Sequence, residues 1–175
     1  MASLTSILPL GRRALVFLFF LTFAPALFAM APKQPEVMVR FFVETNEQDT
    51  EKFAVPIDLK FPPRKAFIER VSSINEQMIR AIYPFQARDG SWGCAFKLDE
   101  SGRLNLEVVS TGRRGSSIVA FIGGKKGNSR QVIDMNIDKP IHDGIISIPS
   151  GLSEQEIAVL TKAFPTLGKN NRKKS

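Results

Sequence analysis

The sequence predicts an α+β fold with a mostly antiparallel sheet and two or three helices packed on one of its faces. Several short segments alternate apolar and polar residues, which is typical of strands that bury one side. Two other segments place Ser three positions before Glu at the start of an apolar run, which is typical of a capped helix start. Many strands with few helices favour an α+β class.

The N-terminus is predicted to direct export. MASLTSILPLGRR is a short basic leader, and the uncharged apolar run ALVFLFFLTFAPALFA follows it and ends in small residues suited to cleavage. The alternative is an uncleaved anchor, because about 18 apolar residues can just span a bilayer. We therefore expect residues 1–31 to be a signal peptide or an N-terminal anchor, and the protein to be periplasmic or associated with the cell envelope.

The basic charge of the chain is concentrated at its ends. The formal net charge is +7, but two of the 24 basic residues lie in the leader and four lie in the last seven positions, KNNRKKS. The remaining body carries 18 basic and 17 acidic residues. This distribution argues against nucleic-acid binding by the folded part. Residues 169–175 are expected to be a basic, disordered tail, and contact with a membrane through the leader or this tail stays open.

Residues 32–65 are predicted to be N-terminal strands that extend the sheet. EVMVRFFVE alternates, which places Val37, Val39, Phe41 and Val43 on one side of a half-buried strand. FAVPIDLKF is a second strand, and its Pro56 favours an edge position because proline cannot donate to a neighbouring strand. KAFIERV follows the Pro-Pro break as a third strand.

The next segment predicts a helix followed by a strand. Ser73 and Glu76 have capping-box spacing, so a helix is expected to start at Ile74 and to end before Pro84. In WGCAFKL, alternation then places Cys94 inside the fold. Because burial raises a thiol pKa, this single cysteine is interpreted as a core residue rather than a reactive one.

Residues 103–111, RLNLEVVST, fit a strand or a helix equally well. SSIVAFI is a strand, and the loop GGKKGNSR separates it from its expected partner QVIDMNI. Near the end, IISI predicts a strand and Pro-Ser-Gly a turn. Ser153 and Glu156 then form a capping box, Leu152 packs on Ile157 as a staple, and Pro165 stops the helix.

No catalytic, cofactor or metal site is predicted. The single histidine, His142, lies beside Asp143 without a second histidine or an activated nucleophile. The D-x-N-x-D pattern from Asp134 to Asp138 lacks the later ligands of a calcium loop. Ile133, Met135 and Ile137 alternate with these polar residues and are expected to form the buried face of a strand. The GGKKG segment lacks the pattern of a phosphate-binding loop.

Two basic turns are the candidate partner-binding residues. Arg113 and Arg114 lie in TGRRG, and Lys125 and Lys126 lie in GGKKG. Both pairs could meet an acidic partner, although exposed charges of this kind are by default only solvated.

An ordered series of segments resembles a known family. IERVSSINEQMIRAI, GSWGCAFKLDESG, SSIVAFIGG and QVIDMNIDKPIHDGIISIPSGLSEQEI are similar to the head region of the first periplasmic domain of SecD, the accessory subunit of the bacterial protein-export channel. The likeness implies a SecD-head-like domain over residues 66–168, with residues 103–111 as a helix on the sheet. It also implies a non-enzymatic role in engaging an emerging polypeptide. No motor function carries over, because SecD has a multi-span membrane bundle and this chain has at most one apolar segment.

We therefore expect an exported, non-enzymatic module of the cell envelope, related to protein export, that binds a polypeptide or an envelope protein. Two alternatives stay open. One is a secreted enzyme that gathers two carboxylates from Asp134, Asp138 and Asp143 in a pocket. The other is a peripheral membrane protein held by an uncleaved leader.

Overall fold

The computed structural model describes residues 37–46, 54–124 and 128–168. The predictions for the leader, residues 1–31, and for the basic tail, residues 169–175, lie outside the described residues. Within the described ranges, no helix has the length and apolar character needed to cross a membrane.

Five strands form an antiparallel sheet in the order β2-β3-β1-β6-β7. They are β1 (Val37–Thr45), β2 (Ala54–Lys60), β3 (Pro63–Glu69), β6 (Ser117–Gly124) and β7 (Ser129–Asn136). The alternation predicted for β1 is confirmed, since Val37, Val39, Phe41 and Val43 are buried. The edge position predicted from Pro56 is also confirmed, because β2 is the outermost strand beside β3.

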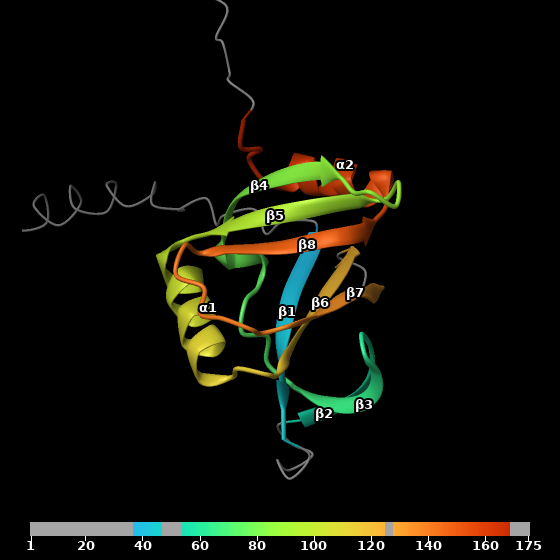
Figure 1. The fold of residues 1–175 in the computed structure, drawn as a ribbon. Helices are drawn as coiled ribbons and strands as arrows, with labels where there is room; N and C mark the ends of the chain where they lie inside the picture. Colours follow the sequence, from blue (N-terminus) through green and yellow to red (C-terminus); the bar gives the residue numbers. More distant parts are fainter. Residues whose placement is uncertain (1–36, 47–53, 125–127, 169–175) are drawn as a thin grey trace, which may run out of the picture. The chain divides into compact units, whose positions relative to one another are not determined.

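A second antiparallel sheet has the order β4-β5-β8. Its strands are β4 (Ile79–Gln86), β5 (Trp92–Leu98) and β8 (Ile145–Leu152), which run side by side in Figure 1. The α+β class and the antiparallel pairing are therefore confirmed, and the strands divide between two sheets.

The helix predicted from Ile74 to Pro84 is wrong. Only a single 3-10 turn, η1 (Glu76–Met78), forms there, and the side chain of Asn75 caps it rather than that of Ser73. Ile74 bonds through its backbone to Phe41 of β1, and the chain from Ile79 pairs with β5 as β4. Tertiary strand pairing thus overrides a local pattern that satisfied helical spacing.

The two helices carry clear start signals. The ambiguous segment at residues 103–111 belongs to α1 (Glu100–Gly112), as the SecD resemblance implied, and Asp99 caps it by accepting a hydrogen bond from the amide of Gly102. α2 (Glu154–Ala163) has the predicted capping box between Ser153 and Glu156. Its buried residues Ile157 and Leu160 face the main core.

The predicted turn at Pro149-Ser150-Gly151 is wrong, because β8 continues through these residues to Leu152. Proline is tolerated there since β8 is an edge strand of its sheet. The pairing with β5 shifts between Cys94 and Trp92, and Gly151 adopts a φ of 88°, a conformation that favours glycine.

Both faces of the five-stranded sheet bury apolar side chains. On one face, Phe41 meets Phe96 of the other sheet edge to face, with ring centroids 5.7 Å apart. On the other face, Phe42 and Phe121 pack at 5.4 Å, and the β2-β3 hairpin contributes Leu59 to this second cluster. β1 is therefore buried on both sides, which makes it the central element of the fold.

Candidate functional site

The structure describes one of the two predicted basic pairs. Arg113 and Arg114 are exposed in the turn that precedes β6, and Arg113 pairs with Glu69 at 3.3 Å. Lys125 and Lys126 lie outside the described residues. A role of either pair in partner binding stays a prediction.

A groove lies between the end of the β6-β7 hairpin and the first turns of α2. It encloses about 520 Å³ and has a mainly apolar floor that includes Val37, Ile122 and Val159. Val159 is 42% exposed although it belongs to an otherwise well-packed helix. These residues come from three elements distant in the sequence, so no local motif could reveal the groove.

One rim of the groove is a polar cluster that is fixed in place. Arg130 of β7 donates to both carboxylate oxygens of Glu156, at 2.8 and 2.7 Å, and to the carbonyl of Gly151. Burial of Glu156 acts to raise its pKa, but the bonds from Arg130 and from Ser153 outweigh this and leave the pKa lowered. The predicted capping box therefore also orients the charged rim, a second role that its sequence did not indicate.

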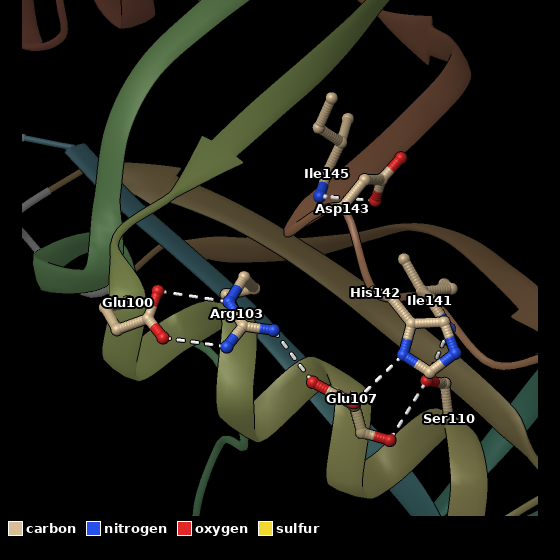
Figure 2. A network of polar contacts seen from close by, with 8 residues as sticks. All are labelled: Glu100, Arg103, Glu107, Ser110, Ile141, His142, Asp143 and Ile145. Atoms are coloured by element: carbon tan, nitrogen blue, oxygen red, sulfur yellow. Dashed lines mark hydrogen bonds and ion pairs between the residues drawn. The ribbon is translucent and has the colours of Figure 1, made fainter.

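A second polar network lies on α1. Figure 2 shows His142 turned toward Glu107, with its Nδ1 2.9 Å from the Glu107 carboxylate and directed away from its chain neighbour Asp143. Arg103 bridges Glu107 and Glu100 along the helix. The hydrogen bond to His142 is the main reason that the pKa of Glu107 is lowered.

This network holds a loop against a helix. The buried hydroxyl of Ser110 accepts a hydrogen bond from the amide of Ile141 at 2.8 Å, next to the contact between His142 and Glu107. Gly144 follows, where an added Cβ would lie 2.9 Å from the Arg103 side chain. The ion pairs on α1 are solvent exposed, so their measurable contribution is small.

The three carboxylates of the enzyme alternative serve different local structures. Asp134 is 4% exposed and accepts hydrogen bonds from the amides of Lys60 and Phe61 in the β2-β3 turn. Asp143 accepts a bond from the amide of Ile145, and Asp138 is exposed. Sequence alternation had placed Asp134 on a polar face, opposite a buried face of Ile133 and Met135. That assignment is wrong for Asp134, which is buried, while Ile137 is buried as predicted and Ile133 and Met135 are half-buried against the core.

The remaining candidates for chemistry are the single cysteine and a possible metal site. Cys94 is fully buried, and this burial raises the pKa of its thiol to about 12, so the thiolate is scarce at neutral pH. Across the described ranges, no three side chains among His, Cys, Asp and Glu come together as metal ligands.

The described residues form a small α+β module, and its fold is similar to part of the solved structures of SecDF. A structure of SecDF, described as a membrane component that enhances protein export, matches with a TM-score of 0.48 and 13% identity over 75% of this chain and 64% of that one. A crystal structure of SecDF in a super-membrane-facing form matches with a TM-score of 0.50 and 13% identity, over 75% of this chain and 19% of that one. This chain thus spans less than two thirds of either matched chain.

The resemblance to SecD that the sequence indicated is confirmed at the level of the fold. No family model matches the chain. No curated protein matches it either.

Proposed function

We propose that the protein is an exported, non-catalytic module that binds extended polypeptide in the cell envelope and takes part in protein export. The SecD-like fold supports this proposal, because a SecD head is the part that the family resemblance associates with an emerging chain. Fold likeness alone does not specify a ligand, so the binding surface must supply the rest of the argument.

The groove between the β6-β7 hairpin and α2 carries the proposal. Its apolar floor offers a site for one or two apolar side chains, and its rim of Arg130 and Glu156 offers charges to the polar groups of a bound backbone. Binding sites for peptides commonly combine an apolar floor with a few fixed polar groups. The ion pair at the rim is held by three hydrogen bonds, so its side chains lose little conformational freedom on binding.

The test is equilibrium binding of a fluorescently labelled, unfolded secretory polypeptide, followed by anisotropy. Val159→Asp places a charge in the apolar floor and is expected to weaken binding by about tenfold or more, since it removes apolar contact and buries a charge. Val108→Asp is the matched control, because Val108 is 71% exposed on α1.

If Val159→Asp, Val108→Asp and the wild type bound the polypeptide with equal affinity, the groove would not be the binding site. Failure of the wild type to bind any unfolded polypeptide would overturn the proposed function itself. Thermal unfolding of each variant shows whether a loss of binding reflects a loss of folding.

A further inference from the structure

The two sheets of the described residues present four edges, and an edge is where an extended polypeptide can add as a further strand. β2 and β7 are the outer strands of the five-stranded sheet, and β4 and β8 are those of the three-stranded sheet. An edge accepts a new strand when a run of its N–H and C=O groups points outward unpaired. Because these groups alternate in direction along a strand, the contacts at each edge show which residues point outward.

On β2, a proline interrupts the outward run of donors. The amide of Lys60 donates to the carboxylate of Asp134 on β7, at 3.0 and 3.1 Å, and therefore points away from β3. Pro56 lies four residues earlier, so it has the same outward direction, and it has no N–H to donate. Only the amide of Asp58 lies between these two positions, so β2 offers no two consecutive outward donors.

The edge of β8 is interrupted in the same way. The carbonyl of Gly144 accepts a hydrogen bond from β5 at 2.9 Å, so Gly144 and every second residue after it face β5. The residues between them, Ile145, Ser147 and Pro149, point outward. The amide of Ile145 donates to the carboxylate of Asp143 at 3.0 Å, and Pro149 has no N–H. The amide of Ser147 is therefore the one outward donor between two blocked positions.

On β4, the chain covers its own edge. The amide of Ile82 donates to the carbonyl of Pro165, and the amide of Leu167 donates to the carbonyl of Ile82, both at 2.8 Å. Thr166 thus pairs with Ile82 in parallel and occupies the position that an added strand would take. Pro84, two residues further along β4, has the same outward direction and no N–H.

The edge of β7 is contacted by two other parts of the fold. Arg130 donates to the carbonyl of Gly151 in β8 at 2.8 Å. The amino group of Lys60 lies 3.4 Å from the carbonyl of Gln131, and Asp134 binds the turn after β2. All four edges are therefore interrupted or covered, and an outward proline takes part on β2, β4 and β8. Natural sheets avoid the addition of a further strand by such features.

We infer that the protein binds a polypeptide through apolar side chains, in the groove beside α2, and does not add it as a strand to either sheet. This inference rests on the proposed function and specifies how the ligand is recognised. The floor of the groove, at Val37, Ile122 and Val159, is apolar. The two charged residues of its lining, Arg130 and Glu156, form an ion pair and so neutralise each other. An uncharged, apolar segment of an unfolded polypeptide fits such a site.

The test measures the binding of three forms of one labelled peptide to the full chain by fluorescence anisotropy. The peptide alternates leucine and serine, and its first form has an ordinary backbone. The other two forms replace three alternate amides by esters, at the leucines or at the serines, which removes N–H donors and keeps every side chain. An added strand pairs through only one of these two sets of amides. A slip by one residue would turn the leucines to the opposite face, so a shift of register cannot restore the lost bonds.

We expect both ester peptides to bind within about threefold of the ordinary peptide, because the side chains that the groove contacts are unchanged. Val159→Asp should weaken the binding of all three peptides by about tenfold or more, and Val108→Asp should weaken none of them.

Strand addition predicts a different result. It would weaken one ester peptide by about tenfold or more and spare the other, because each of three lost hydrogen bonds changes the affinity by about two- to tenfold. That result overturns the inference and leaves the proposed function standing. If neither the three peptides nor the unfolded secretory polypeptide bound, the proposed function itself would be wrong, and this inference with it.

Discussion

Removing the Asp134 carboxylate should detach the β2-β3 hairpin from the rest of the fold. Its oxygens accept hydrogen bonds from the amide of Phe61 at 2.7 Å and from the amide of Lys60 at 3.0 and 3.1 Å. Hydrogen bonds to a charged acceptor contribute about 1.5–3 kcal/mol each, and a buried donor that loses its partner costs a similar amount. Because these two amides are partly buried, we expect Asp134→Ala to cost about 2–4 kcal/mol.

The substitution Asp134→Asn separates charge from shape. Asparagine keeps one acceptor oxygen but turns its NH₂ group toward a backbone donor, so it should cost about 1–2 kcal/mol, less than alanine. Asp138→Ala is the matched control, since this nearby carboxylate is exposed and should change stability by less than about 0.5 kcal/mol.

Urea denaturation measures these differences, and amide hydrogen exchange locates them. In Asp134→Ala, protection should fall at Lys60 and Phe61 and in the strands on either side, while β5 keeps its protection. If Asp134→Ala unfolds at the same urea concentration as Asp138→Ala, the carboxylate does not hold the hairpin and the reasoning fails.

Three further outcomes are expected from other buried or paired groups. The hydrogen bond from Arg64 lowers the pKa of Glu44 in the folded protein. The pair therefore stabilises the fold fully above the unfolded carboxyl pKa of about 4.3. This stabilisation is lost as the pH falls through the lower pKa of the folded state. The difference in unfolding free energy between wild type and Glu44→Gln, measured by urea denaturation across pH 2–7, should shrink on acidification; a constant difference would contradict the assignment. Gly93→Ala should lower stability by about 1–3 kcal/mol because its methyl group would overlap the Phe85 ring, and an unchanged melting temperature would show that the ring moves freely. Cys94 should react with a thiol reagent at pH 8 only at the rate of unfolding, and fast labelling of native protein would contradict its burial.

Sequence patterns predicted elements well where the two faces of an element differ in burial. In β1 one face is fully buried and the other half-buried, so its alternation is visible, and the capping box of α2 is a local rule that the tertiary structure also obeys. The helix prediction after Ser73 was wrong because the spacing of Ile74, Met78 and Ile82 fits a helix and also fits the observed structure. In that structure Ile74 bridges to Phe41 of β1, and Ile82 lies inside β4. A local pattern cannot choose between these, since the deciding hydrogen bonds come from residues far away in the sequence.

The candidate sites were harder to predict for the same reason. The groove combines Val37 with Val159, and the buried position of Asp134 depends on a hairpin more than 70 residues earlier in the chain. Alternation along β7 correctly marked a strand but not which side is buried, because both faces of the five-stranded sheet are covered. Where both sides of a strand are buried, a polar residue at either parity can be enclosed, and only its hydrogen bonds reveal it.

The burial of β1 on both faces also determines where a partner can bind. The three-stranded sheet and α2 cover one face of β1, and the β2-β3 hairpin closes over Phe42 on the other. Exposed apolar side chains remain at Val159 beside the groove and at Tyr83 on β4, and also away from both, at Phe61, Val71 and Val108. The groove and Tyr83 share no residue, and Val159→Asp changes only the groove. If this variant kept full polypeptide binding, the binding surface would have to lie at one of the other exposed apolar side chains.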